Sequence, residues 1–177
     1  MVIILRGISG SGKSSLVDHL IKHREQKLPV SNTEAQKFLC SLMKTPDLVS
    51  YSADYHFMLN GNYVFDPRYL PAAHRYCMQA FTKDLVNASA TGGNRTNTMV
   101  VDNTNTTLVE VLPYIALAEA FGQEIHVVTL VADPVECLKR NKHGVPFSSI
   151  IRQDINLRKS IAEWPDRMAS YQQIFPE

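Results

Sequence analysis

The chain has 177 residues, of which 45% are hydrophobic and 20% charged, a balance typical of one globular domain with a buried core. The net charge of +1 neither favours nor excludes a nucleic-acid partner, and the absence of a run of about 18 apolar residues argues against a membrane span. The 3 cysteines form no C-x-x-C pair and no signal-type segment opens the chain. We therefore expect a single cytoplasmic domain over residues 1–177, with free thiols.

The first predicted element is a short buried strand at Val2–Leu5. The sequence GISGSGKS follows it, and from Gly7 to Ser14 it matches the P-loop pattern G-x-x-x-x-G-K-[ST]. Apolar residues then recur at helical spacing, so a helix is expected from Lys13 to about Arg24. The order of strand, glycine loop and helix is the context that this motif requires. We therefore interpret the loop as a nucleotide-binding site rather than a chance turn.

Each residue type in this loop has a chemical purpose. Glycines let backbone N–H groups turn toward phosphate oxygens, and the start of the next helix directs its positive end at the same phosphates. Lys13 can reach the β- and γ-phosphates, and the Ser14 hydroxyl can bind Mg²⁺. The dinucleotide fingerprint G-x-G-x-x-G does not fit, because Ser15 takes the place of its last glycine. The predicted nucleotide-binding residues of the loop are Gly7, Ser9, Gly10, Ser11, Gly12, Lys13, Ser14 and Ser15.

Helix and strand patterns then alternate. A helix is expected around Thr33–Met43 and a strand near Leu48–Ser52. A longer helix begins at FDP, where Asp66 suits the N-cap and Pro67 the first helical position. Its buried face is expected to consist of Ala73, Cys77, Phe81 and Leu85.

Two further buried strands are predicted, at Thr98–Asp102 and within Glu124–Asp133. A loop over residues 90–97 precedes the first of them. Between the two strands a helix is expected to start at Pro113 and to end just before Gly122. Such alternation is typical of an α/β protein with a parallel central sheet and helices on both faces.

The last predicted elements surround a basic segment. Pro134 opens a short helix that runs into KRNKHGVP, Pro146 ends it, and apolar residues predict one more helical turn around Phe147–Ile151. Basic side chains of this kind can bind nucleotide phosphates or form a solvated face. The basic residues here are Lys139, Arg140, Lys142, His143, Arg152, Arg158 and Lys159.

Polar residues follow the predicted strands in SADYHF and VVDNTNT, at the sheet edge where α/β proteins bind ligands. Asp102 ends an apolar run of the Walker-B type, so its carboxylate can hold Mg²⁺ through the water shell. A turn or helix cap is the alternative role. The P-loop makes us favour the metal role.

Two further residues have possible roles in catalysis. Asp54 can act as a general base toward an acceptor hydroxyl, although a cap is supported almost equally by the residues alone. Arg140 can close over the γ-phosphate and exclude water, or can end a solvated helix. The neighbouring Tyr55, His56 and Phe57 can stack on an acceptor base or belong to the core.

Taken together, these segments resemble the polynucleotide-kinase-like group of P-loop kinases. The similarity rests on GISGSGKSS, SADYHFM, YVFDPRYLPAAHRYC, VVDNTNTT, PYIALAEAFG and LKRNKHGVP in this order, over about residues 1–153. The chain looks close to the P-loop domain of the Nedd-four-binding-protein-two type and more distant from phage polynucleotide kinases. The resemblance implies a P-loop NTPase/kinase three-layer sandwich with a parallel central sheet, a helical insertion on the acceptor side and a lid at about residues 139–147.

The implied activity is transfer of the γ-phosphate of ATP or GTP, with Mg²⁺, to the 5′-hydroxyl of RNA or DNA. By position, Lys13 and Ser14 would serve the phosphates and Mg²⁺, and Asp102 the metal. Asp54 would be the base and Arg140 the lid arginine.

The sequence also departs from this group, so the mode of acceptor binding stays open. Phe57 replaces an arginine that helps the phage enzymes to bind the acceptor, His143 falls about where they carry a second lid arginine, and Tyr55 replaces a second Asp. We expect no attached phosphatase or ligase domain. A small-molecule or nucleotide-sugar kinase of the zeta-toxin type and a non-catalytic NTP-binding module remain alternatives, and the oligomeric state is open. RNKHG lacks the Asp of N-K-x-D, which argues against a classical GTPase.

Overall fold

The computed structural model describes residues 1–23, 33–42, 47–90 and 98–176. The predicted loop at 90–97, apart from its first residue, lies outside the described residues, as do Arg24 and Met43. All three cysteines lie within these ranges and are free thiols. Among the described residues, no helix combines the length and apolar character needed to cross a membrane.

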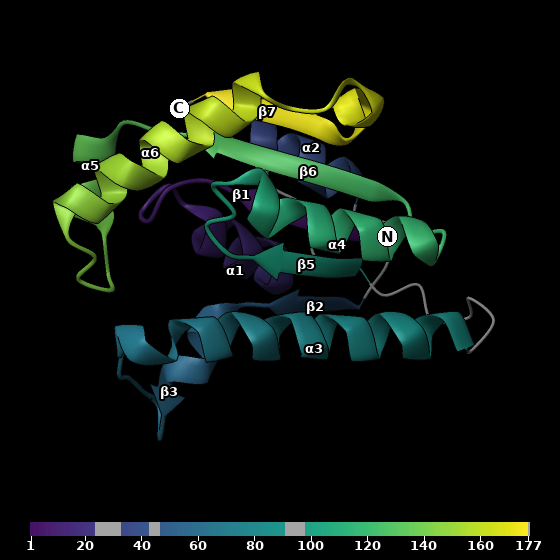
Figure 1. Cartoon of the computed structure of the whole chain (residues 1–177), viewed down its shortest axis with the longest axis horizontal. Helices are drawn as coiled ribbons and strands as arrows, with labels where there is room; N and C mark the ends of the chain where they lie inside the picture. The colour runs from purple at the N-terminus through teal and green to yellow at the C-terminus, as the bar shows by residue number, and fades with distance from the viewer. Residues whose placement is uncertain (24–32, 43–46, 91–97, 177) are drawn as a thin grey trace.

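A parallel sheet of 5 strands forms the centre of the molecule (Figure 1). The strand order is β2-β5-β1-β6-β7, and every neighbouring pair is parallel. The predicted α/β fold with a parallel central sheet is therefore confirmed. The strands are β1 (Val2–Arg6), β2 (Leu48–Tyr51), β5 (Thr98–Asp102), β6 (Ile125–Val131) and β7 (Gln172–Pro176).

The central strands are mostly apolar because helices cover both faces of the sheet. In β1 every residue is buried, and alternate side chains point to opposite faces. Val2 and Ile4 belong to one core cluster, whereas Ile3 and Leu5 belong to another. The run of apolar residues in the sequence thus reflects two separate cores, one on each side of the sheet.

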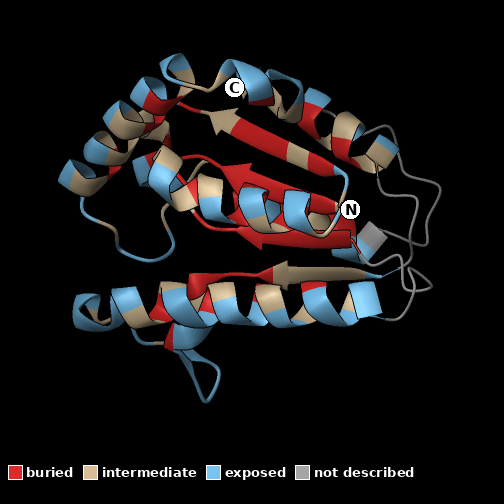
Figure 2. Ribbon diagram, turned by 45° about the vertical axis from the view of Figure 1, so that its right-hand side comes forward, coloured by how far each residue is buried: buried red, intermediate tan, exposed pale blue. Residues whose placement is uncertain are grey.

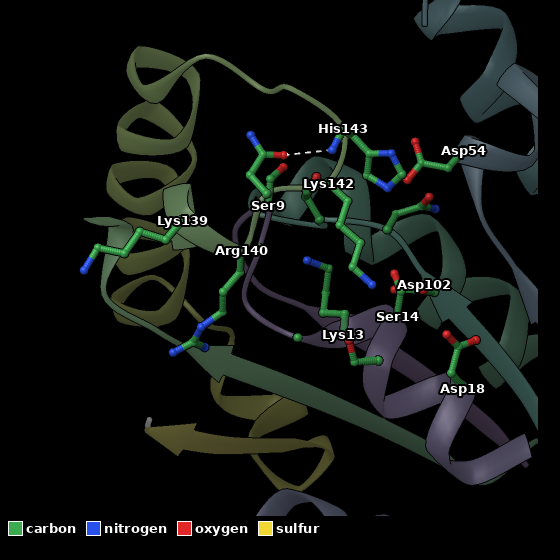
Figure 3. Close-up of a pocket in the computed structure, with 16 residues that line it drawn as sticks. Ser9, Lys13, Ser14, Asp18, Asp54, Asp102, Lys139, Arg140, Lys142 and His143 are labelled. Carbon is green, nitrogen blue, oxygen red and sulfur yellow. Dashed lines mark hydrogen bonds between the residues drawn. The ribbon is translucent and has the colours of Figure 1, made fainter. Parts of the chain in front are cut away.

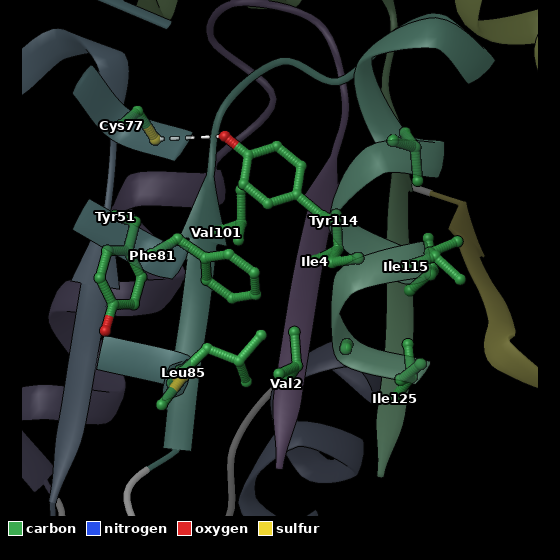
Figure 4. Close-up of a cluster of buried hydrophobic side chains, with 14 of the residues drawn as sticks. Val2, Ile4, Tyr51, Cys77, Phe81, Leu85, Val101, Tyr114, Ile115 and Ile125 are labelled. Atoms are coloured by element: carbon green, nitrogen blue, oxygen red, sulfur yellow. Dashed lines mark hydrogen bonds between the residues drawn. The ribbon is translucent and has the colours of Figure 1, made fainter. Parts of the chain in front are cut away.

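Helices α3 (Leu70–Ala90) and α4 (Leu108–Ala120) cover one face. Helices α1 (Lys13–His23) and α2 (Glu34–Leu42) cover the other. Figure 4 shows the first core, where rings from α3 and α4 pack over the sheet. The ring centroids of Phe81 and Tyr114 are 5.2 Å apart and their planes meet at 75°, an edge-to-face arrangement that aromatic pairs favour.

The start of α3 follows the predicted capping chemistry. The Asp66 carboxylate accepts a hydrogen bond of 2.9 Å from the backbone N–H of Arg68, and a short 3₁₀ turn at Pro67–Tyr69 leads into the α-helix. The buried residues of α3 are Ala73, Cys77, Phe81 and Leu85, which confirms the predicted buried face.

Two predicted helix boundaries were wrong. Helix α4 begins at Leu108, so Pro113 lies inside it. The start is fixed earlier by a capping box, in which the Glu110 carboxylate accepts a 2.8 Å hydrogen bond from the backbone N–H of Thr107. Gly122 follows the helix with a φ of 62°, as predicted for a glycine just past a helix end.

The second correction concerns the segment around Pro146. Helix α5 (Pro134–Arg140) starts as predicted, with Asp133 as its N-cap, but it ends at Arg140, well before the proline that was expected to end it. Pro146 is the N-cap of a long helix, α6 (Phe147–Ala162), where only one turn was expected. The prediction missed most of α6 because its buried residues are widely spaced among charged ones.

Two strand elements were not predicted. A hairpin of β3 (Met58–Leu59) and β4 (Asn62–Tyr63) turns at Asn60 and Gly61, whose φ angles are 50° and 82°. An Asn-Gly pair with both φ angles positive is the favoured two-residue hairpin turn, so a local signal was present. The edge strand β7 follows a 3₁₀ helix at Asp166–Tyr171 and carried no comparable signal.

A buried arginine ends the first strand. Arg6 is 0% exposed, and its Nε donates a 2.9 Å hydrogen bond to the backbone oxygen of Asn105. Its Nη2 donates to the Ser160 hydroxyl, and its guanidinium lies 5.1 Å from the ring centroid of Trp164. Burial lowers the pKa of Arg6 to about 10, so the side chain stays charged at neutral pH. Arg6 therefore joins β1, the turn after β5 and α6.

Candidate active site

A cavity of about 610 Å³ lies where β1, β2 and β5 end, at the sheet edge where α/β proteins bind ligands (Figure 3). It brings together the loop after β1, two aspartates from different strand ends and the loop between α5 and α6. Its lining residues are Ser9, Gly10, Gly12, Lys13, Ser14, Ser15, Asp18, Asp54, Asp102, Asn103, Thr104, Lys139, Arg140, Asn141, Lys142 and His143.

The glycine loop is held by close contacts with α5 and α6. Gly10 has a φ of 86°, and a Cβ there would lie 2.2 Å from the backbone oxygen of Cys137 in α5. The backbone N–H of Ser9 donates a 2.8 Å hydrogen bond to the Gln153 side chain of α6. Only glycine fits at position 10, because any side chain would strain the backbone and collide with α5.

The side chain of Lys13 is folded into the loop. It is 7% exposed, and its Nζ donates hydrogen bonds of 2.8 Å and 2.9 Å to the backbone oxygens of Gly7 and Ile8. Burial lowers the pKa of the Lys13 ammonium group, whereas the nearby Asp102 carboxylate favours its charged form. The loop therefore holds a cation at its centre.

Asp102 and Ser14 form a place suited to a divalent cation. Asp102 is 8% exposed, and its Oδ1 has no hydrogen-bond partner among the residues that the structure describes. Burial raises the pKa of this carboxyl group, while Lys13 and a hydrogen bond with the Ser14 side chain oppose the rise. A buried carboxylate oxygen without a partner is costly unless a cation or water satisfies it.

The described residues hold no cluster of three or more His, Cys, Asp or Glu that could bind a metal by itself. Mg²⁺ keeps several waters and is bound by few protein groups together with substrate phosphates. Ser14 and Asp102 would hold the ion here. Asp18, one turn after Ser14 on α1, adds a further carboxylate to the cavity.

We expect Asp102→Asn to weaken Mg²⁺ binding in the nucleotide complex by about 10- to 100-fold, the usual cost of changing a group that acts through the water shell of a metal. The measurement is a Mg²⁺ titration of nucleotide binding. Asp154→Asn, in α6 and outside the cavity lining, is the matched control. An unchanged Mg²⁺ dependence in Asp102→Asn would show that the ion is held elsewhere.

Asp54 stands on a short 3₁₀ helix, Ala53–Phe57, capped by Ser52. Its Oδ1 accepts a 2.8 Å hydrogen bond from the Tyr63 hydroxyl. Burial and this bond raise the pKa of Tyr63, which keeps the phenol protonated as a donor. The backbone N–H of Ala53 donates a 2.8 Å bond to the Asn103 side chain, so the segments that carry Asp54 and Asp102 are tied together.

The basic loop after α5 reaches over the cavity. In Figure 3 the Lys142 side chain points toward Lys13 and Asp102, whereas Arg140 points away from that pair. Arg140 also lines a second cavity, of about 540 Å³, that shares Gly12 and Ser15 with the first. Apolar and small residues dominate the rest of this cavity's lining, including Leu16, Leu130, Val131, Ala132, Phe175 and Pro176.

Most of the predicted site residues meet in the first cavity, with two exceptions. Gly7 lines neither cavity; its carbonyl accepts a hydrogen bond from Lys13, and its N–H donates one to the backbone oxygen of Thr104. Ser11 lines the second cavity. Sequence reasoning missed Asp18, whose helical spacing from Ser14 was a usable signal. It also missed the contact of Tyr63 with Asp54, which depends on the unpredicted hairpin.

Five parallel strands, a P-loop between the first strand and helix, and an acidic residue at the end of β5 define a P-loop nucleotide-binding domain. Residues 2–143 match the family model described as AAA domain, which is more than half of the chain. The chain therefore belongs to this family, and its P-loop kinase-like character, expected from the sequence motifs, is confirmed.

A known human protein and a solved bacterial structure are similar to this chain. The chain is 29% identical over 162 residues to human NEDD4-binding protein 2, and this match covers 86% of the chain and 7% of that protein. The chain thus spans a small part of this relative. The structure of the tunicamycin resistance protein of Deinococcus radiodurans superposes with a TM-score of 0.51 at 13% identity, covering 99% of this chain and 84% of that one. At this identity the likeness supports the fold alone.

Proposed function

We propose that this protein is an NTP-dependent kinase that transfers the γ-phosphate of ATP or GTP, with Mg²⁺, to the 5′-hydroxyl of RNA or DNA. The observation that carries the proposal is that Asp54 lies in the same cavity as Lys13 and Asp102. A P-loop alone serves hydrolysis or switching equally well. A carboxylate facing the phosphate site adds the group that an acceptor hydroxyl needs.

In this proposal the triphosphate of the donor lies along the glycine loop, with Lys13 at its β- and γ-phosphates. The nucleoside occupies the second cavity, whose apolar lining suits a base. Arg140 lines both cavities, and in this proposal its side chain turns from its observed position toward the phosphates when the nucleotide binds. Lys142 supplies a further cation beside Lys13.

The chain's own residues would act mainly by orientation and charge. Asp54 is held by a hydrogen bond from the Tyr63 hydroxyl. It accepts the proton of the acceptor hydroxyl as the oxygen of that hydroxyl forms a bond to the γ-phosphorus. At the same time the bond between the γ-phosphorus and the β-phosphate oxygen breaks. Lys13, Arg140 and Lys142 stabilise the charge that spreads over the phosphate oxygens. When bound, Mg²⁺ would neutralise charge on the β- and γ-phosphates.

A label-transfer assay tests the proposal. γ-Labelled ATP and GTP are offered, with Mg²⁺, to 5′-hydroxyl RNA and DNA oligonucleotides, nucleoside 3′-monophosphates and nucleotide sugars, with a water-only control. We expect label on oligonucleotides. Label only on a small molecule would show that the protein is instead a small-molecule kinase of the zeta-toxin type. Nucleotide binding without a labelled acceptor would favour a regulatory module.

A further inference from the structure

Exposed apolar and aromatic side chains gather beside Asp54. They come from the 3₁₀ helix that carries it, from the β3–β4 hairpin, from the segment between this hairpin and α3, and from α3 itself. Figure 2 shows the hairpin standing out from the body of the molecule. Each is 47% to 58% exposed, and the set is Tyr55, Met58, Leu59, Val64, Phe65, Tyr69 and Tyr76. Large side chains so exposed in one place mark an interaction site.

Rings in and beside this surface contact one another in stacked, tilted and edge-to-face arrangements. The rings of His56 and Tyr76 are stacked, with centroids 5.1 Å apart and an interplanar angle of 20°. Phe57 lies next to both His56 and Phe65, with ring centroids 5.4 Å and 5.0 Å away, and is only 3% exposed. Phe57 is thus a core residue that supports the exposed rings. Of the two roles that the sequence left open for it, stacking on an acceptor base or packing in the core, the structure shows the second.

The surface also carries basic groups. Arg68 lies in the 3₁₀ turn that precedes α3, and Arg75 lies in α3 beside Tyr76 in the sequence. Asp66 is paired with Arg68 at 2.6 Å. The ring of His143, in the basic loop after α5, lies 4.2 Å from that of Tyr63. Aromatic rings and the basic loop that carries Lys142 and His143 therefore lie around one carboxylate, Asp54.

We propose that this surface binds the first nucleotides of a single-stranded 5′-hydroxyl end, with bases stacked on Tyr55 and on the His56–Tyr76 pair. The inference rests on the proposed function and specifies its acceptor. Every base offers a flat face for stacking on aromatic rings, and cations attract the phosphates. In a duplex the bases are stacked and paired with one another, so a blunt end cannot offer those faces. The enzyme would therefore select single strands and overhangs.

Steady-state transfer measured with Tyr55→Ala and Tyr76→Ala tests the inference. We expect KM for a single-stranded 5′-hydroxyl oligonucleotide to rise about 10- to 100-fold in each variant, the usual cost of losing one stacking ring, with little change in kcat. Tyr76→Phe keeps the ring and should restore KM. Val86→Ala, 44% exposed and farther along α3, is the matched control.

Altered oligonucleotide acceptors provide a second measurement. For the wild-type protein, a blunt duplex and an oligonucleotide with abasic sites at its first two positions should show raised KM values. A variant with both Tyr55→Ala and Tyr76→Ala should give similar KM values for the abasic and intact oligonucleotides, because both tyrosine rings on which the bases stack are gone.

Binding of a 5′-phosphorylated oligonucleotide, followed by fluorescence anisotropy, separates this inference from the proposed function. Oligonucleotide transfer with unchanged KM in both alanine variants would overturn the inference and leave the function standing. Binding that depends on Tyr55 and Tyr76 without any transfer would support the surface and overturn the function. No binding and no transfer by the wild-type protein would overturn both, and leave the surface to a protein partner.

Discussion

Asp54→Asn is expected to lower kcat for phosphate transfer by about 10²- to 10⁴-fold, the range that a positioned general base contributes. Asparagine keeps the shape of the side chain, and its amide oxygen can still accept the hydrogen bond from Tyr63. It cannot take up the proton of the acceptor hydroxyl. Nucleotide binding should stay largely intact, because Lys13 and the glycine loop hold the phosphates.

Two measurements check this expectation: label transfer to the preferred acceptor, and nucleotide affinity by titration calorimetry. Asp154→Asn serves again as the aspartate outside the cavity lining. If Asp54→Asn transferred phosphate at the wild-type rate, Asp54 would not be the base. A loss of nucleotide affinity equal to the loss of rate would instead assign Asp54 a role in binding.

Lys13→Ala should reduce transfer by about 10²- to 10³-fold, the cost of removing one donor that is aimed at developing charge. The ammonium group is buried at the centre of the loop and bonded to the backbone oxygens of Gly7 and Ile8. It can leave these neutral oxygens for the charged phosphates, which are stronger partners. Nucleotide binding should weaken as well, which distinguishes this variant from Asp54→Asn.

Lys13→Arg supplies the matched control for charge. A guanidinium is planar and larger than an ammonium group, so the buried position should not accept it without displacing the loop. We expect Lys13→Arg to remain defective, and thermal unfolding of each variant would check that the fold persists. Full activity in Lys13→Arg would mean that positive charge alone is required there.

Prediction from the sequence succeeded best for elements that are determined by residues close together along the chain. Four strands were predicted because they are apolar runs, and the P-loop because its glycines, lysine and serine follow a fixed order. The buried face of α3 followed from helical spacing. Three predicted site residues lie on these elements, and the structure places them in the lining of one cavity: Lys13, Ser14 and Asp102.

Features that depend on distant residues could not be predicted in this way. Arg6 looks like the polar end of an apolar run, yet its burial depends on Ser160 and Trp164, far along the chain. Strand β7 has two glutamines and a final proline, and it forms only because β6 offers an edge. The contact between Tyr63 and Asp54 likewise depends on the β3–β4 hairpin, which brings the two side chains together.

The contact between Gly10 and Cys137 limits how the active site can open. The glycine loop touches the backbone of α5 and is hydrogen-bonded to α6, so neither helix can tilt without disturbing the phosphate site. Between them lie residues 141–146, braced by a 2.7 Å hydrogen bond from the Asn141 side chain to the backbone oxygen of Val145. If this segment is the lid, it can move only as a short loop that is held at both ends by α5 and α6. The distance that this loop can move is then limited by its length of six residues, because the helices on either side stay in place.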